Sequence, residues 1–210
     1  MKNATAVKER PILMSAPMVC ALIEGRKTQT RRVVALREFG PSDTLGYQWH
    51  FRDRRGLWND ISTERLLELC PYGVPGDRLW VRETWHHEDA SCFDPKCGQP
   101  THIFYRVTEP YPESIRWRPS IFMPRWASRI TLEITEVRVQ RVQETSEEDA
   151  RAEGVDITTG RIDAIANCET EPKNLREVYG RLWDFLNAKS GYSWASDPWV
   201  WVIGFKRVAV

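Results

Sequence analysis

The sequence is short of net charge, of long hydrophobic runs and of repeats. Its 30 lysines and arginines almost balance 29 aspartates and glutamates, which leaves a net charge of +1 over 210 residues. A uniformly basic surface is therefore excluded, and binding of nucleic acid would need a local cluster of cations. No apolar run approaches the roughly 20 residues of a membrane-spanning helix, and no segment has the pattern of a signal peptide.

Cysteine is present but forms no disulfide pattern. The five cysteines are an odd number without the spacing of a disulfide scaffold, so a reducing, cytoplasmic compartment is expected. His86, His87, Cys92 and Cys97 lie close together and are all zinc-ligand types, but their spacing lacks a paired CxxC. We predict a polar surface loop here, with no metal and no cofactor; a zinc site is the alternative.

Tryptophan, by contrast, is abundant, at ten residues. Several aromatic residues stand among arginines within residues 33–75, and the set is Tyr47, Trp49, Phe51 and Trp58 with Arg52, Arg54 and Arg55. Such residues can stack on nucleic-acid bases, but an insertion that packs onto its own domain needs the same types. The second interpretation is favoured, with a small hairpin and a short helix near residues 61–69.

The most distinctive stretch is residues 11–32, PILMSAPMVCALIEGRKTQTRR. Ser15 as N-cap and Gly25 as a stop predict a short helix after an opening strand. Directly behind Gly25 come four cations and three hydrogen-bonding side chains in residues 26–32. Such a segment would make a poor core strand and suits contact with an anion or a polar ligand.

Four further segments have strand character, namely residues 78–85, 102–108, 129–142 and 198–208. Within the third, Ile130, Leu132 and Ile134 alternate, but the alternation slips before Val137 and again before Val142. These slips predict β-bulges, which bend strands around small barrels.

Two helices are predicted in the second half of the chain. Residues 145–154 have a capping-box start at Thr145 or Ser146 and a stop at Gly154. Residues 172–189 carry an amphipathic stripe that we assign to the core: Leu175, Val178, Tyr179, Leu182, Trp183, Phe185 and Leu186. The first helix ends on Glu153, whose carboxylate meets the negative end of the helix dipole at a cost of up to about 1 kcal/mol. This local conflict marks Glu153 as a candidate functional residue.

Strands and helices do not alternate along the chain, so a doubly wound parallel sheet is not expected. The order predicts an α+β fold, mostly β: a small antiparallel β-barrel flanked by helices, with loop insertions.

Several motifs together resemble the ASCH domain, a PUA-like barrel related to RNA-binding modules. They are GRKTQTRR (25–32), PGDRLWVRETW (75–85), the strand 129–142 followed by SEEDARAEG (146–154), and WVWVIGFKRV (199–208). The resemblance implies one domain over residues 11–208, with insertions at about 33–75, 86–101 and 155–171 and a disordered segment 1–10. The form with these insertions is similar to many phage-encoded proteins.

ASCH domains include small bacterial amidohydrolases that remove the acyl group from N(4)-acetylcytidine with a Lys–Thr–Glu triad. The family's Lys and Thr in GRKTxT match Lys27 and Thr30, and its Glu at the end of the short helix matches Glu153. The resemblance and the helix-dipole argument thus select the same glutamate. They imply a nucleoside or nucleobase substrate with an N(4)-acyl group.

Two versions of the chemistry are open. In the favoured one Thr30 is the nucleophile and Lys27 its base, which requires the Lys27 pKa to fall well below its usual value of about 10.4. Burial and the neighbouring Arg26 and Arg31 would lower that pKa, and a charged Glu153 would raise it. In the other version Glu153 activates water while Lys27 and Thr30 bind the oxyanion.

Arg26, Glu83 and Trp85 are candidate substrate contacts, although Glu83 and Trp85 are at least as well explained as structural residues. We also expect the insertions to roof the pocket and to admit acyl groups larger than acetyl. Two other functions are open, a non-catalytic RNA-binding module and a ribonuclease. RNA would then contact the face formed by Arg116, Trp117, Arg118, Arg125, Trp126 and Arg129.

Overall fold

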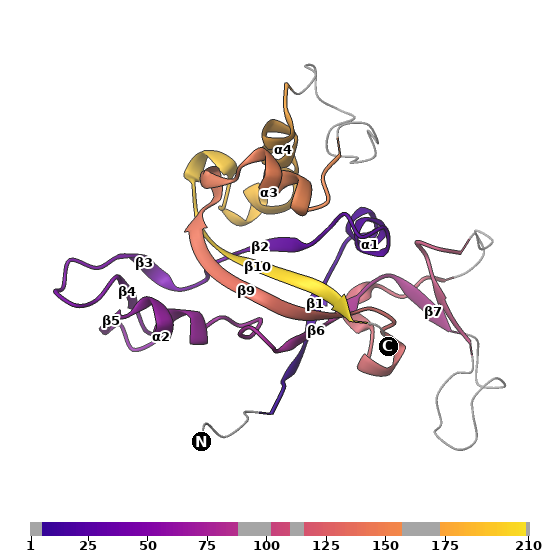
Figure 1. Ribbon diagram of the computed structural model, residues 1–210, viewed down its shortest axis with the longest axis horizontal. Helices are drawn as coiled ribbons and strands as arrows, with labels where there is room; N and C mark the ends of the chain where they lie inside the picture. Colours follow the sequence, from indigo (N-terminus) through magenta and orange to yellow (C-terminus); the bar gives the residue numbers. More distant parts are fainter. Residues whose placement is uncertain (1–5, 88–101, 110–115, 157–172, 209–210) are drawn as a thin grey trace.

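The computed structural model describes residues 6–87, 102–109, 116–156 and 173–208. The described chain is mixed α/β and mostly β, and its largest sheet has the strand order β1-β6-β9-β10-β2. These strands are β1 (Glu9–Leu13), β6 (Arg78–Arg82), β9 (Thr131–Arg141), β10 (Trp199–Val208) and β2 (Gln29–Val33). β9 and β10 form a long, curved antiparallel pair through the middle of the molecule (Figure 1).

The slip in hydrophobic alternation corresponds to a β-bulge, as predicted. Gly204 pairs with Glu136 and the next residue, Phe205, pairs with Ile134, so Thr135 is the extra residue on β9. A bulge adds local twist and bends the strand that carries it, which accounts for a strand that starts in one core and ends in another. The second slip falls where β9 gives way to a single helical turn, Val142–Glu144.

The predicted antiparallel barrel is corrected to an open sheet. Among the residues that the structure describes, β1 and β2 lie at opposite edges and no pairing closes the sheet. In addition, β1 pairs with β6 in parallel. Helix α1 (Ala16–Ile23) connects β1 to β2, and it therefore carries the chain from one edge of the sheet to the other.

The insertion after β2 folds as predicted, as strands and a short helix. It consists of β3 (Arg37–Pro41), β4 (Trp49–Arg52), β5 (Trp58–Ile61) and α2 (Thr63–Glu68). Trp49 stacks on Phe39 at 5.1 Å between ring centroids and meets the edge of Trp199 at 5.0 Å. These aromatic contacts fasten the insertion to β10, in agreement with packing onto its own domain.

Helices α3 (Glu147–Ala152) and α4 (Leu175–Asn187) lie together at one end of the β9–β10 pair (Figure 1). The capping box at the start of α3 joins Ser146 and Asp149, one of the two predicted pairs. The stripe of α4 is only partly core, because Phe185 and Leu186 are 62% and 55% exposed. Including these two residues in the core was therefore wrong, because their side chains remain largely open to solvent.

The remaining strands are short. Strand β7 (Trp85–His87) pairs with β8 (Ile103–Tyr105), and the predicted strand 78–85 breaks after Arg82. Residues 9 and 10, expected to be disordered, belong to β1. No helix in the described ranges is long and apolar enough to cross a membrane.

Alternate residues of β10 face two different cores, which sets the position of the site. Trp201, Ile203 and Phe205 belong to the cluster under β1, β6 and α1. Val200 and Val202 belong to a second cluster beneath α3 and α4. The edge strand β2 runs beside β10 at the border of these two cores.

Candidate active site

The candidate site forms where the cationic segment 26–32 crosses the end of α3. Gly25, with φ of +75°, ends α1 and turns the chain. The Thr28 N–H then donates to the Ala152 carbonyl at 2.8 Å, which holds the segment against α3 before β2 begins. The expectation of a poor core strand was wrong in one respect, because β2 is a strand and Gln29, Thr30 and Arg31 are buried.

A buried ion pair lies at the centre of the site. Lys27 Nζ donates to Glu153 Oε2 at 2.8 Å and to the Glu153 carbonyl oxygen at 2.8 Å. The two side chains are 1% and 5% exposed. Two of the three donor positions of the Lys27 ammonium are thus used within the described chain, and the third is open.

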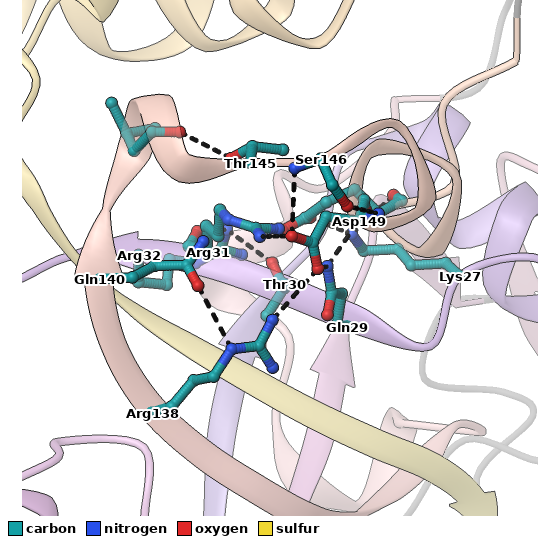
Figure 2. A network of polar contacts seen from close by, with 12 residues as sticks. Lys27, Gln29, Thr30, Arg31, Arg32, Arg138, Gln140, Thr145, Ser146 and Asp149 are labelled. Carbon is teal, nitrogen blue, oxygen red and sulfur yellow. Dashed lines mark hydrogen bonds and ion pairs between the residues drawn. The ribbon is translucent and has the colours of Figure 1, made fainter. Parts of the chain in front are cut away.

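A second cation binds the same carboxylate. Arg31 Nη1 donates to Glu153 Oε1 at 3.1 Å, and the Arg31 side chain is fully buried. Arg31 Nη2 lies 2.9 Å from Asp149 Oδ2, although neither Nη2 nor Nε meets hydrogen-bond geometry with any described residue. Asp149 in turn accepts from Gln29 at 2.9 Å and from Arg138 at 3.1 Å (Figure 2). The anion predicted for the cationic segment is therefore supplied by α3 itself.

Gly154 allows this close approach between α3 and the cationic segment. A Cβ at Gly154 would lie 2.7 Å from Ala21 Cβ and 3.1 Å from Lys27 Cβ, and its φ is +87°. Only glycine suits both the left-handed conformation and the space. The helix stop predicted from sequence is thus also the contact that lets the Lys27 side chain reach Glu153.

The electrostatic surroundings favour a lysine that can lose its proton. Burial lowers the pKa of Lys27 below its ordinary value, and the charge and hydrogen bond of Glu153 oppose this shift. The charges of Arg32 and Arg31 lower the Lys27 pKa further. Arg26, which we expected to contribute, is not among the causes of this shift.

Thr30 lies in the wall of the same cavity. It pairs with Ile203 across the β2–β10 ladder and is 1% exposed. Its hydroxyl oxygen accepts from Arg32 Nη1 at 3.1 Å. No hydrogen bond joins Thr30 to Lys27 among the described residues, so proton transfer between them would need a small rearrangement when a ligand binds.

A cavity of about 290 Å³ brings Lys27, Thr30 and Glu153 together. It is lined by Leu13, Met14, Ser15, Met18, Lys27, Thr30, Arg31, Arg32, Glu153, Tyr179, Leu182, Trp183, Leu186 and Asn187. The polar side comes from the cationic segment and α3, and the apolar side from α1, α4 and the end of β1. Residues 33–75 contribute nothing to the lining, so this insertion does not roof the cavity, contrary to expectation. The other two predicted insertions, 86–101 and 155–171, lie almost entirely outside the described residues.

Tyr179 belongs to the core, as the sequence predicted, and it also lines the cavity. It is buried on α4, and the Arg31 guanidinium lies 5.8 Å from its ring centroid. Burial raises the pKa of Tyr179 well above its ordinary value, as does the charge of Glu153, so its hydroxyl keeps its proton. Helical spacing alone cannot distinguish a tyrosine in a core from one whose ring forms a cavity wall.

The three candidate substrate contacts lie outside the cavity lining. Arg26 donates to the Gly154 carbonyl at 2.9 Å and to Glu24. Glu83 forms a bidentate pair with Arg129, with both contacts at 2.9 Å. Trp85 is buried in a separate small cluster beside β7. Glu83 and Trp85 therefore have the contacts of structural residues, which was the alternative interpretation from the sequence.

The proposed RNA face is only partly free for a ligand. Arg125 is paired with Glu9 at 2.8 Å, Arg129 is paired as described above, and Arg118 lies over the Trp85 ring at 5.4 Å. Cys92 and Cys97 of the alternative zinc site fall outside the described residues. Elsewhere in the described ranges no group of three metal-ligating side chains occurs.

No family model and no curated protein matches the chain. Among solved structures, it is similar to the crystal structure of protein EF3133 from Enterococcus faecalis, described under the family model DUF984. The identity is 13% and the TM-score is 0.34. The match covers 89% of this chain and 64% of the other, so this chain spans less than two thirds of that protein's length.

Proposed function

We propose that the chain is an amidohydrolase that removes the acyl group from N(4)-acylated cytosine or cytidine. The observation that carries the proposal is the buried Lys27–Glu153 pair, which lines the same cavity as Thr30. A buried lysine with a lowered pKa is a suitable base, and a hydroxyl in the same cavity is a suitable nucleophile.

In the proposed reaction, neutral Lys27 takes the proton of Thr30 as its oxygen attacks the acyl carbonyl carbon. The C–N bond then breaks, and the Lys27 ammonium returns the proton to the departing N(4) nitrogen. Water, activated by Lys27, hydrolyses the resulting ester and frees the threonine hydroxyl. Glu153 orients Lys27 throughout and stabilises its transient positive charge, while the Arg32 N–H at the Thr30 oxygen stabilises developing negative charge there.

The alternative in which Glu153 activates water is less well supported. Both carboxylate oxygens already accept from a cation, Oε2 from Lys27 and Oε1 from Arg31. Each oxygen is thus already held by a cation, which places Glu153 to orient Lys27 rather than a water molecule. Lys27, in contrast, has one ammonium N–H without a partner in the described chain. When Lys27 loses this proton, the nitrogen has a lone pair there that can accept the proton of Thr30.

The cavity suits a small molecule better than a polymer. Its volume of about 290 Å³ lies just below the usual range for ligand pockets, about 300 to 1,000 Å³. Methionine and leucine side chains along α1 and α4 offer no hydrogen bonds, which suits the hydrocarbon part of an acyl group. We propose accordingly that α4, and not the insertion 33–75, sets the tolerance for acyl groups larger than acetyl.

The same proposal includes an ASCH relationship with a PUA-like core. It is supported by the contact between Lys27 and Glu153, which are more than a hundred residues apart in sequence, and by the cavity that both line together with Thr30. The open sheet differs from the closed barrel that this relationship implies, which leaves the relationship to be tested through its chemistry.

The test is hydrolysis of N(4)-acetylcytidine and N(4)-benzoylcytidine followed by ultraviolet absorbance. We expect turnover by the wild type and loss of at least about a hundredfold in Lys27→Ala, Thr30→Ala and Glu153→Ala. Thr28→Ala is the matched control, because Thr28 is exposed, neighbours Lys27 in sequence and does not line the cavity. A folded wild type that hydrolyses neither substrate would contradict the proposal.

A further inference from the structure

We propose that Arg31 is a positioning residue, which shares the Glu153 carboxylate with Lys27 and thereby keeps Lys27 able to act as a neutral base. The inference rests on the proposed function, in which Lys27 takes the proton of Thr30. Arg31 lies within the matched segment GRKTQTRR, but the family's triad corresponds to Lys27, Thr30 and Glu153, so the resemblance assigns Arg31 no role.

The geometry gives each cation one oxygen of a single buried carboxylate. Lys27 Nζ is 2.8 Å from Oε2 and Arg31 Nη1 is 3.1 Å from Oε1 of Glu153. The cations of Lys27, Arg31 and Arg32 face two carboxylates, those of Glu153 and Asp149, so this water-poor site holds an excess positive charge that is costly to bury. Arg31 cannot lose its proton at ordinary pH, so Lys27 is the group of the two that can relieve this cost.

The groups around Lys27 agree with this division. The charged and titratable ones, by element, are Glu153 and Asp149 on α3, Arg31 and Arg32 on β2, Tyr179 on α4, and Glu24 at the end of α1. Glu24 is paired with Arg26 near the surface, and Tyr179 remains neutral. Glu153 is therefore the main group that favours the ammonium form of Lys27, and Arg31 competes with Lys27 for it directly.

Asp149 keeps Arg31 in this position. Its carboxylate lies 2.9 Å from Arg31 Nη2 and is fixed by the capping box with Ser146 and by Gln29. Burial would raise the pKa of Asp149, but these hydrogen bonds and the charge of Arg31 hold it below its ordinary value. The anchor is therefore charged over the pH range in which Lys27 would act.

Arg138 provides a matched control on the same anchor. Its Nη2 contacts Asp149 Oδ1 at 3.1 Å, but it does not contact Glu153 and does not line the cavity. Removing Arg138 takes a cation from Asp149 and leaves the carboxylate shared by Lys27 and Arg31 intact. A general effect on α3 would appear in both variants, whereas an effect on Lys27 would appear only at Arg31.

The experiment is kcat/KM against pH for the wild type, Arg31→Met and Arg138→Met. In Arg31→Met the Glu153 carboxylate pairs with Lys27 alone, which favours the ammonium, so the acid limb is expected to move to higher pH. At pH 7 the rate should fall about tenfold, while the alkaline plateau stays within about twofold of the wild type. Arg138→Met should follow the wild-type profile, and Arg31→Lys, which keeps the charge, should restore most of the acid limb.

A second readout does not depend on activity. Lysine labelled with ¹³C at Cε reports the protonation of Lys27 by its chemical shift, with Lys27→Met to assign the signal. The Lys27 titration should move to higher pH in Arg31→Met and stay in place in Arg138→Met. If the wild type hydrolyses neither substrate, the proposed function fails, and this titration still decides whether Arg31 acts on Lys27. A Lys27 titration that does not move in Arg31→Met, or a rate lowered equally at every pH, would overturn the inference. If Arg31→Met unfolds, Arg31→Gln takes its place.

Discussion

Two buried glutamates in this molecule make a direct comparison. Glu153 is 4% exposed and Glu83 is 1% exposed, and each forms an ion pair with an arginine. Both were candidate site residues from the sequence. The structure gives them different surroundings: Glu153 lines a cavity beside Lys27, and Glu83 lies between β6 and β7, where it pairs with Arg129.

The difference lies in how completely the partner arginine is satisfied. Arg129 uses Nε and Nη2 on Glu83 and Nη1 on Thr108, and it lies 3.9 Å over the Tyr105 ring. Arg31, in contrast, has two buried nitrogens without a hydrogen bond in the described chain. A saturated pair stabilises a fold, whereas an unsaturated one beside a titratable lysine and a cavity has the properties of a reactive site.

The largest expected effect comes from making the same change at both glutamates. Glu153→Gln should lower kcat/KM by about a thousandfold, because Lys27 loses the carboxylate that orients it. Its stability cost should be small, since Lys27 can lose its proton and Arg31 keeps Asp149. Glu83→Gln should leave activity within about twofold but cost about 3 kcal/mol of unfolding free energy, because Arg129 stays charged without a carboxylate.

Hydrolysis assays and urea unfolding of both variants check this prediction. Equal loss of activity in the two variants would mean that Glu83 also serves the reaction. Glu153 could then no longer be distinguished as a site residue from Glu83 as a structural residue. Equal loss of stability would mean that Lys27 cannot relieve the buried charge.

A smaller effect is expected from the glycine that brings the site pair together. Gly154→Ala places a Cβ against Ala21 and Lys27 in a left-handed conformation, so it should cost about 2 kcal/mol and lower activity about tenfold. Gly191→Ala is the matched control, because Gly191 has the same φ of +87° and open space around it. The control should lose stability only, by about 1 kcal/mol, as measured by thermal unfolding beside the hydrolysis assay.

Much of this comparison could be predicted from sequence, because it depends on local chemistry. The Ser146 capping box, the stop at Gly154 and the bulge between Ile134 and Val137 all follow from patterns within a few residues. The conflict between Glu153 and its helix dipole also follows from a local pattern. The Glu153 carboxylate at that helix end is compensated by two cations, Lys27 and Arg31, which lie far away in the sequence.

The parts that could not be predicted are those that depend on long-range packing. The edge strand β2 has buried polar residues, and by composition it cannot be distinguished from a surface loop. Only its contacts with α3, which is far away in sequence, show that these residues are buried. Tyr179 has the spacing of a core residue and packs in that core, but its additional place in the cavity wall depends on how α4 lies against the Arg31 side chain. Similarly, the pairing of Glu83 with Arg129 joins two strands that are far apart in sequence.

A third prediction concerns the pH dependence of stability. The pKa of Lys27 is lowered by folding, so between that value and about 10.4 the unfolded chain binds more protons, and stability rises with pH. The slope from this one group cannot exceed about 1.4 kcal/mol per pH unit, and Lys27→Met should remove it. Urea unfolding at a series of pH values measures the slope. An unchanged slope in Lys27→Met would mean that folding does not shift this lysine.

The smallest expected effect lies on the Glu83 side of the comparison. Burial raises the pKa of Tyr105 to about 12, with Arg129 opposing and Glu83 reinforcing the shift. In the wild type Tyr105 should therefore stay protonated near pH 10, where an exposed tyrosine ionises. In Glu83→Gln the Arg129 charge acts without its carboxylate, so Tyr105 should ionise at lower pH. Absorbance titration against Tyr105→Phe isolates this signal. If Glu83→Gln and the wild type titrate alike at Tyr105, then Arg129 does not stay over the tyrosine ring when its carboxylate is removed, and the saturated pair is held together by Glu83 alone.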